Sequence, residues 1–199
     1  MLVTKKAPDF TAPAVMPDNT IVEDFNLYEN IGEKGAVLFF YPLDFTFVCP
    51  TELLAFDHRI EEFKKRGISV IGCSVDSQYS HLAWKNTPVD KGGIGNVRYP
   101  IVADLTKKIA KDYDVLLEDA GVALRGSFLI DKDGTIRHAV INDLPLGRNI
   151  DEMLRMVDAM EFANEYGEVC PAEWEKGKEA MKPTPEGVAE FLSKHANEL

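Results

Sequence analysis

Apolar residues gather along the chain in two patterns, uninterrupted runs and runs with helical spacing. Residues 36–41 and 68–75 are largely apolar throughout, which is typical of strands buried on both faces of a sheet. Between them, apolar side chains from Leu53 to Phe63 recur three or four positions apart, with charged residues on the opposite face. This spacing predicts one helix, which Gly67 ends. We therefore expect a strand, a helix and a second strand in succession.

Downstream segments add two short helices, two strands and one long amphipathic helix. They are predicted at about residues 80–85, 106–113, 122–130, 135–141 and 149–166. The turn sequence Asp131-Lys-Asp-Gly134 separates the two strands, which predicts an antiparallel hairpin. Residues 1–27, rich in proline and aspartate, predict an irregular or hairpin-like N-terminal layer. This order of elements favours a thioredoxin-like α/β fold, with a central mixed sheet flanked by helices.

The periodic pattern ends after Gly167. The last segment contains scattered prolines and a tryptophan, and only a short helix at about 186–195 is predicted near its end. We therefore predict a thioredoxin-like domain over residues 1–166 and an extended C-terminal arm over residues 167–199. An arm with so little periodicity is expected to pack on something other than its own core, such as a partner subunit.

Composition and charge narrow the classes of function. The formal net charge of -11 on 199 residues repels phosphate backbones and anionic lipid, so neither nucleic acid nor a membrane is an expected partner. The longest apolar run, residues 36–41, is too short to span a bilayer, and no targeting segment is recognisable. We therefore expect a cytoplasmic location. In that reducing compartment the three cysteines favour a catalytic or redox role over a disulfide framework.

Cys49 is the cysteine whose position points to chemistry. It follows a predicted buried strand and precedes a predicted helix, where free backbone N–H groups and the helix dipole favour a thiolate over a thiol. The thiolate is the nucleophilic form of cysteine. Position alone leaves two alternatives open, an activated nucleophile or a buried and inert small hydrophobic residue.

The neighbours of Cys49 narrow these alternatives. In a thioredoxin-type oxidoreductase the partner cysteine stands three positions after the first, but this chain has Glu52 there. Any disulfide formed by Cys49 must therefore reach a remote cysteine. Upstream, Pro42 is expected to shield the sulfur and shape the loop, and Thr46 offers a hydroxyl that both donates and accepts hydrogen bonds. The spacing of Thr46 and Cys49 places both groups on one face if the segment is helical.

The pattern Pro42-x-x-x-Thr46-x-x-Cys49 resembles the active-site motif of the peroxiredoxin family. Residues 47–52, Phe-Val-Cys-Pro-Thr-Glu, resemble the typical two-cysteine branch of that family, which includes thioredoxin-dependent peroxidases and alkyl hydroperoxide reductases. Several further matches follow in order, so the resemblance covers nearly the whole chain.

Three of these further matches involve single functional residues. Arg125, ahead of Gly-Ser-Phe, matches the family's active-site arginine. The segment Asn-Asp-Leu-Pro-Leu-Gly-Arg148 resembles the one with a second arginine, which the resemblance implies to form a network with Glu52. The segment Gly-Glu-Val-Cys170-Pro-Ala resembles the motif of the resolving cysteine. Taken alone, Arg125 is as well explained by a surface ion pair and Cys170 by packing of the tail.

The resemblance implies a thiol peroxidase that reduces hydrogen peroxide and organic hydroperoxides. Peroxide oxidises Cys49 to a sulfenic acid, Cys170 forms a disulfide with it, and thioredoxin or a similar dithiol protein reduces that disulfide. The two cysteines are implied to lie on different subunits of a homodimer, and dimers are implied to assemble into a decamer. Neither a cofactor nor a metal is implied.

Other signals have simpler explanations. Cys73 lies inside an apolar run and is expected to be a buried core thiol. The four histidines are scattered at spacings that do not suit zinc. The sequence Asp131-Lys-Asp-Gly134 lacks the third acidic position of a calcium loop before the glycine, and Asn142 stands at the twelfth position where glutamate is required. Residues 92–95, Gly-Gly-Ile-Gly, lack the lysine and hydroxyl residue of a phosphate loop and resemble the glycine motif of easily over-oxidised peroxiredoxins.

Two other classes of function compete with catalysis of peroxide reduction. A peroxide sensor or holdase chaperone is compatible with the family resemblance as a secondary role. However, Phe191-Leu192 stands where over-oxidation-sensitive members carry a Tyr-Phe pair, which argues against the chaperone switch. A general disulfide oxidoreductase is disfavoured by Glu52, which replaces the second cysteine of its motif.

Overall fold

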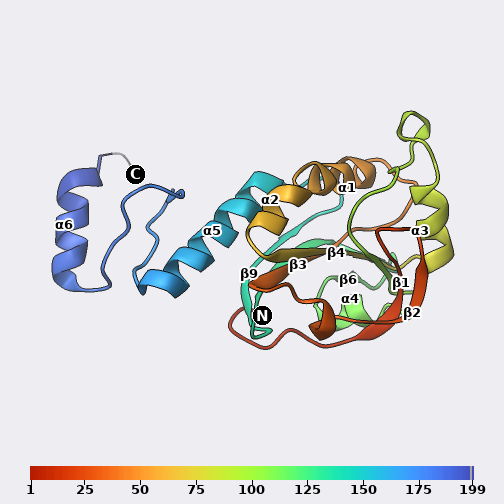
Figure 1. Ribbon diagram of the computed structural model, residues 1–199, viewed down its shortest axis with the longest axis horizontal. Coiled ribbons are helices and arrows are strands. Elements are labelled where there is room, and N and C mark those ends of the chain that lie inside the picture. Colours follow the sequence, from red (N-terminus) through yellow and green to blue (C-terminus); the bar gives the residue numbers. More distant parts are fainter. Residues whose placement is uncertain (198) are drawn as a thin grey trace. The chain divides into compact units, whose positions relative to one another are not determined.

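A seven-stranded mixed sheet forms the core of residues 1–150. The computed structural model describes residues 1–197 and 199 (Figure 1). The strand order is β2-β1-β5-β4-β3-β8-β9, with bounds Ile21–Asn26, Thr11–Val15, Ile101–Ala103, Ile68–Ser74, Gly35–Phe40, Arg125–Asp131 and Ile136–Asn142. The β3–β4 and β4–β5 pairs are parallel and the other four pairs are antiparallel, so the predicted mixed sheet is confirmed.

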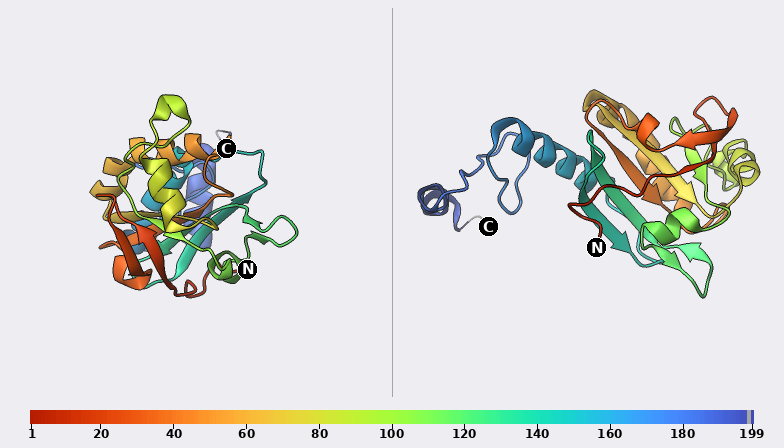
Figure 2. Two further views of the ribbon diagram at one scale, coloured as in Figure 1. Left: turned by 90° about the vertical axis from the view of Figure 1, so that its right-hand side faces the viewer. Right: turned by 90° about the horizontal axis from the view of Figure 1, so that it is seen from below.

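Six α-helices accompany this sheet in the described part of the chain. Their bounds are Cys49–His58 for α1, Ile60–Lys65 for α2, Gln78–Lys85 for α3, Lys108–Asp112 for α4, Ile150–Tyr166 for α5 and Pro185–His195 for α6. Short 3-10 turns, η1 and η2, occupy Tyr28–Asn30 and Val89–Lys91. Views from three sides place α1 and α2 over one face of the sheet and α4 over the other (Figures 1 and 2).

The strand β3 is buried along its whole length, as its continuous apolar run predicts. It pairs in parallel with β4, where Phe40 stands opposite Cys73, and in antiparallel with β8. Because a strand with neighbours on both sides and cover on both faces has no solvent-facing side chain, an uninterrupted apolar sequence suits it. The end of β3 leads directly into the loop of residues 41–48 and then into α1.

The helix predicted over Leu53 to Phe63 is instead two helices, which is a correction to the sequence analysis. Arg59, with φ -104 and ψ 6, interrupts the chain between α1 and α2, and its N–H bonds to the Phe56 carbonyl at 3.1 Å. Both helices keep their apolar residues buried, so the spacing of those residues continues unchanged across the break. Apolar spacing alone therefore could not reveal the interruption.

The strand predicted over 122–130 is also divided. Val122–Ala123 forms β7, which pairs with β6, Leu116–Leu117, in a separate two-stranded sheet, and β8 begins only at Arg125. Leu124 lies between them and donates its N–H to the Val115 carbonyl at 2.8 Å. Continuous apolar sequence could not show that the chain changes its pairing partner at this point.

The hairpin predicted at Asp131-Lys-Asp-Gly134 is confirmed. β8 and β9 pair in antiparallel, and the Asp131 carboxylate accepts the backbone N–H groups of Asp133 and Thr135 at 3.0 and 2.9 Å. Gly134 has a φ of 80° in this turn, a conformation that suits glycine. In the N-terminal layer β1 pairs in antiparallel with β2.

The chain divides into two compact units, residues Met1–Ile150 and Asp151–Leu199. The first unit contains the sheet, and the second contains α5, the loop after it and α6. The predicted boundary at 166/167 followed the end of the periodic pattern, whereas α5 from Asp151 onward forms one compact unit with the tail. The functional division between domain and arm stays a prediction. None of the helices in the described part of the chain combines the length and apolar character needed to cross a membrane.

Gly35 at the start of β3 provides a test of this close packing. Its φ is 152°, and a Cβ added there would lie 2.3 Å from the Ile130 carbonyl oxygen of the neighbouring strand. We expect Gly35→Ala to lower the free energy of unfolding by roughly 2–5 kcal/mol. This loss combines the cost of backbone strain with the cost of overpacking. Urea denaturation measures the change.

The matched control for this prediction is Gly92→Ala. Gly92 also has a positive φ, 82°, but an added Cβ would meet nothing within 4 Å. Gly92→Ala should therefore lower the free energy of unfolding only by the cost of placing alanine at a positive φ, about 1–2 kcal/mol. Equal losses in the two variants would show that contact with Ile130 does not constrain the start of β3.

Candidate active site

Cys49 is the first residue of α1 and is fully buried. Pro50 follows it in the first turn, where proline is tolerated because its missing N–H has no helical partner in any case. The free N–H groups and positive dipole end of α1 therefore lie at the sulfur, as the sequence predicted. Pro42 is buried at the other end of the loop, two residues beyond β3.

Thr46 binds the sulfur directly. Its Oγ1 lies 3.0 Å from Cys49 Sγ and 2.7 Å from the Leu43 carbonyl oxygen. A hydroxyl has one proton, so Thr46 donates to only one of these acceptors at a time. A thiolate competes for that proton, whereas a neutral thiol leaves it to the Leu43 carbonyl. The hydroxyl thus adapts to the charge on the sulfur without moving the side chain.

Arg125 is the first residue of β8 and approaches the same sulfur from the sheet. Its Nη1 lies 3.3 Å from Cys49 Sγ and 2.7 Å from Glu52 Oε2, and its Nε donates to the Leu144 carbonyl at 2.7 Å. The side chain is 4% exposed. These contacts place a fixed positive charge against the sulfur, with the guanidinium oriented by two acceptors on other elements.

Glu52 receives a second arginine. Arg148 Nε lies 2.8 Å from Oε1 and Nη2 lies 2.9 Å from Oε2, which is the bidentate geometry that a guanidinium favours. The backbone N–H of Arg148 donates to Oε1 as well, at 3.0 Å. The remaining nitrogen, Nη1, donates to the Gly126 carbonyl and to Ser127 Oγ at 3.0 and 3.1 Å.

The Arg148 guanidinium also covers an aromatic ring. Its central carbon lies 5.1 Å from the centre of the Phe39 ring, which is stacked on Phe56 with ring centres 4.1 Å apart. A cation over an aromatic face at this distance is attracted by the ring quadrupole. Aromatic side chains of β3 and α1 thus pack beneath the plane of the Arg148 guanidinium. The sequence analysis did not predict this cation–π contact.

The charges of this cluster do not balance among the arginines and the glutamate. Two buried guanidiniums face one buried carboxylate, with side-chain exposures of 4%, 3% and 2% for Arg125, Arg148 and Glu52. A surplus positive charge in a buried site is costly unless an anion compensates it. A thiolate on Cys49 is the anion within contact distance, so the cluster is electrically neutral when the sulfur is ionised.

The loop that carries Thr46 is anchored by a buried polar network. The Asp44 carboxylate accepts the hydroxyls of Tyr41 and Ser80, each at 2.8 Å, and contacts His81 Nδ1 at 2.8 Å. His81 Nε2 lies 3.1 Å from the Val102 carbonyl oxygen. Burial, followed by the Asp44 charge, raises the pKa of Tyr41 well above its ordinary value, so the phenol remains a donor.

This network was missed by the sequence analysis, in which His81 was one of four scattered histidines. Its members come from the loop, from α3 and from β5, and their sequence separation conceals their proximity. The sequence offered one indication of this network. Ser80 and His81 are adjacent polar residues in a short predicted helix, and the apolar spacing of that helix gives no reason for them.

The other two cysteines differ from Cys49. Cys73 is fully buried in β4, and burial raises its pKa well above the ordinary value, with the Asp104 charge adding to the effect. The expectation of a core thiol is confirmed. Cys170 belongs to the second compact unit, is half-buried, and has a pKa raised mainly by burial. Within the described residues, no group of three or more histidine, cysteine or acidic side chains could hold a metal ion.

Two family models together match most of the chain. One, described as the AhpC/TSA family, matches residues 3–139, and one described as the C-terminal domain of 1-Cys peroxiredoxin matches residues 159–194. Although the second is named after proteins with one active cysteine, the segment it matches here contains Cys170.

Individual proteins are similar over nearly the full length. Alkyl hydroperoxide reductase C of Helicobacter pylori is 62% identical over 199 residues, which cover 100% of both chains. The solved structure of reduced 2-Cys peroxiredoxin from Plasmodium vivax has a TM-score of 0.93 and 52% identity, covering 97% of this chain and 99% of that one. Thioredoxin peroxidase I of Plasmodium yoelii has a TM-score of 0.77 and 50% identity, covering 88% and 99%.

The charge imbalance around Glu52 generates a prediction about stability. Glu52→Gln keeps the shape of the side chain but leaves two buried guanidiniums without a carboxylate. We expect a loss of about 3–5 kcal/mol in the free energy of unfolding, the usual cost of breaking a buried pair by removing one partner. Urea denaturation of the reduced protein measures it.

Glu61→Gln serves as the control for that measurement. Glu61 also contacts two cations, Lys64 at 3.2 Å and Arg98 at 3.1 Å, but its side chain is 58% exposed. Exposed pairs of this kind contribute about 0–1 kcal/mol. If Glu52→Gln proved no more destabilising than Glu61→Gln, the buried cluster would not be the electrostatic unit described above.

Proposed function

The chain belongs to the AhpC/TSA family and is a peroxiredoxin, a thiol peroxidase with the thioredoxin-like fold of that family, and from this premise we propose that its cycle begins at the sulfur of Cys49. One observation supports this assignment above all others. Thr46 Oγ1 at 3.0 Å and Arg125 Nη1 at 3.3 Å both contact Cys49 Sγ, so an oxygen atom approaching the sulfur meets two hydrogen-bond donors. Cys73 is equally buried, but burial and the Asp104 charge raise its pKa well above the ordinary value, so it is held as the neutral thiol.

In the first step the Cys49 thiolate attacks the terminal oxygen of a hydroperoxide, ROOH. An S–O bond forms, the O–O bond breaks, and the alkoxide leaves as ROH after it takes up a proton, while the sulfur is oxidised to a sulfenic acid. Negative charge moves from the sulfur to the leaving oxygen during this step. Donors already fixed at the site stabilise that charge without reorganising, and Arg125 and Thr46 are placed to do so.

Glu52 and Arg148 act through Arg125. The Glu52 carboxylate holds Arg125 Nη1 at 2.7 Å, and Arg148 holds the carboxylate in a bidentate pair. A guanidinium bound in this way cannot rotate away from the sulfur. Both residues are therefore positioning residues in our proposal, and Pro42 shapes the loop that bounds the site.

The second step completes the oxidation of two thiols. Cys170 attacks the sulfur of the Cys49 sulfenic acid, an S–S bond forms, and water leaves. We propose that Cys170 comes from the other subunit of a homodimer, that dimers assemble into a decamer, and that the protein works in the cytoplasm. A dithiol protein such as thioredoxin then exchanges with the disulfide and restores both thiols. A similar protein that bears the name thioredoxin peroxidase supports this choice of reductant.

The substrates we propose are hydrogen peroxide and organic hydroperoxides. The chemistry at the sulfur requires only the terminal oxygen of the peroxide, so it does not by itself discriminate between them. The similar protein from Helicobacter pylori is named for the reduction of alkyl hydroperoxides, which supports the inclusion of the organic class.

Replacing each cysteine in turn tests the assignment of roles. Cys49→Ser should abolish peroxide turnover coupled to thioredoxin and its reductase, and Cys170→Ser should abolish the disulfide-linked dimer on a non-reducing gel after one equivalent of peroxide. Cys73→Ser, the matched control, should retain both properties. Full turnover in Cys49→Ser would contradict the proposed function, and an oxidised parent protein that ran only as a monomer would contradict the intersubunit disulfide.

The role of the Thr46 hydroxyl generates a separate prediction. Thr46→Val removes the donor at nearly constant volume and should lower the second-order rate constant for sulfenic acid formation by about 10²–10³-fold, the usual effect of losing one oxyanion donor. Stopped-flow mixing with hydrogen peroxide measures this constant. Thr46→Ser keeps the hydroxyl and should stay within about tenfold of the parent; an equal loss in both variants would assign the effect to the methyl group.

A further inference from the structure

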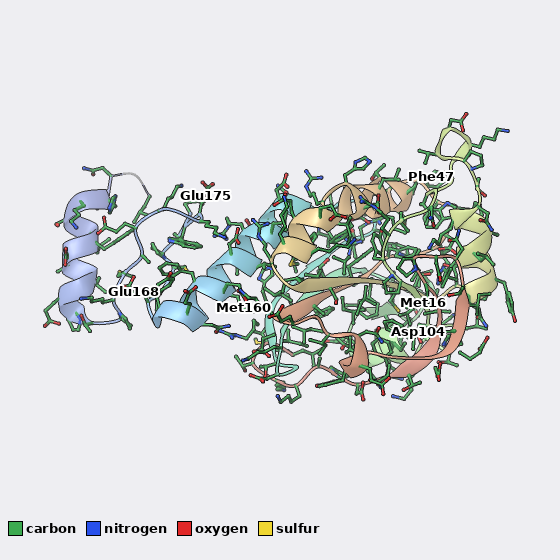
Figure 3. All side chains as sticks on the ribbon, in the orientation of Figure 1. Met16, Phe47, Asp104, Met160, Glu168 and Glu175 are labelled. Atoms are coloured by element: carbon green, nitrogen blue, oxygen red, sulfur yellow. The ribbon has the colours of Figure 1, made fainter. Side chains whose placement is uncertain are left out.

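The loop between α5 and α6, residues 167–184, holds Cys170 and is here named the resolving loop. Glu168 and Glu175 lie within it (Figure 3). It closes on itself, because Val169 and Met181 exchange backbone hydrogen bonds at 2.9 and 3.1 Å. Trp174 forms its interior: the residue is 1% exposed, and its Nε1 donates to the Lys178 carbonyl at 3.2 Å. The loop is thus a small folded unit rather than an irregular tail.

Two contacts attach the resolving loop to α5 close to Cys170. The Trp174 ring lies 5.0 Å, centre to centre, from the ring of Phe162. Cys170 Sγ lies 3.6 Å from the Ala159 carbonyl oxygen, within the distance for a hydrogen bond that involves sulfur. In this position the thiol donates a hydrogen bond to the Ala159 carbonyl, which requires the protonated form of the sulfur.

A third contact is stronger and comes from Arg155 on α5. Its Nη1 donates to the Trp174 carbonyl at 2.7 Å, while Nε and Nη2 bind the two oxygens of Glu152 at 2.6 and 2.8 Å. The planar guanidinium makes both sets of bonds at once, which an ammonium cannot do with the same geometry. Glu152, one turn earlier on the helix, therefore holds the guanidinium in the orientation that reaches the loop.

Arg155 has two opposite effects on Cys170. Its positive charge favours the thiolate, whereas its bond to the loop keeps the thiol where burial raises the thiol pKa. Burial is the larger of these influences on the pKa, so the docked thiol is a poor nucleophile. Release of the resolving loop from α5 removes the burial and frees the proton from the Ala159 carbonyl.

We propose that Arg155 is a positioning residue for the resolving cysteine: by holding the Trp174 carbonyl on α5 it keeps Cys170 docked, and so it sets the rate at which Cys170 becomes available to attack an oxidised Cys49. The inference rests on the proposed function, in which Cys170 resolves the sulfenic acid. Its consequence lies in a competition. The sulfenic acid either loses water to form the disulfide with Cys170, or reacts with a second ROOH to give a sulfinic acid and ROH.

The first experiment measures docking without any peroxide chemistry. In a Cys49→Ser background, the rate at which N-ethylmaleimide labels Cys170 is followed by mass spectrometry in the full-length protein, and the buried Cys73 remains unlabelled as an internal reference. Arg155→Lys and Arg155→Met should both raise the labelling rate about tenfold, which corresponds to about 1.4 kcal/mol. Both replacements are good helix formers, and far-UV circular dichroism checks that α5 persists.

Lys176→Met is the matched control for these variants. Lys176 also links the resolving loop to α5, through Asp158 at 3.7 Å, but its side chain is 72% exposed. Labelling in this variant should stay within about twofold of the parent. If Arg155→Lys labelled like the parent and Arg155→Met labelled more slowly, charge alone would explain the residue and the proposal would be overturned. Unchanged labelling in both variants would overturn it as well.

The second experiment tests the link to Cys49. With all cysteines present, mass spectrometry follows the sulfinic acid fraction of Cys49 during a peroxide titration. Arg155→Lys should shift the onset of sulfinic acid to about tenfold higher peroxide, because a released Cys170 captures the sulfenic acid sooner. Faster labelling with an unchanged onset would overturn the proposal. Absence of a Cys49–Cys170 disulfide in the parent protein would contradict the proposed function instead, and the two failures are thereby distinguishable.

Discussion

The Glu52 carboxylate, held between two guanidiniums, is the contact on which the geometry of the active site depends. It joins three parts of the chain that are distant in sequence: α1, the start of β8 and the segment before α5. With side-chain exposures of 4% or less, none of the three groups can turn to water if a partner is lost. Such a cluster adds little net stability relative to apolar packing. A conformation in which one partner is missing leaves a buried charge uncompensated, and this penalty favours the single arrangement in which all three groups are paired.

The same cluster explains why the reactive sulfur lies where it does. Two guanidiniums and one carboxylate leave a positive charge, and the folded chain holds Cys49 within 3.3 Å of one of the arginines. The Arg125 guanidinium is therefore placed to compensate a negative charge on the sulfur, which burial alone would oppose. Stability and reactivity depend here on the same charge, which accounts for a nucleophile that is fully buried.

Much of this arrangement could be predicted from residues close together in the sequence. The buried strand β3, the helix that begins at Cys49 and the hairpin of β8 and β9 follow from local apolar patterns and turn residues. The site residues were found through motifs, since no periodicity places Arg148 beside Glu52. The break at Arg59 and the end of β7 at Ala123 could not be predicted, because the apolar spacing continues across both. The Asp44–His81 contact escaped because it depends on tertiary proximity alone.

The three cysteines show how far one side chain can be tuned by its surroundings. Cys73 lies among apolar side chains with the Asp104 charge nearby, so burial and charge both oppose ionisation. Cys49 is buried as deeply, yet a guanidinium and a hydroxyl contact its sulfur. Cys170 is half-buried, and burial raises its pKa although the Arg155 charge acts in the opposite direction. The fold thus gives one sulfur two hydrogen-bond donors, leaves another among apolar side chains, and holds the third against the Ala159 carbonyl of α5. In our proposal the second oxidation of Cys49 competes with release of the resolving loop. The strength of a few contacts between α5 and the loop, rather than the chemistry at Cys49, then decides how much peroxide the enzyme tolerates.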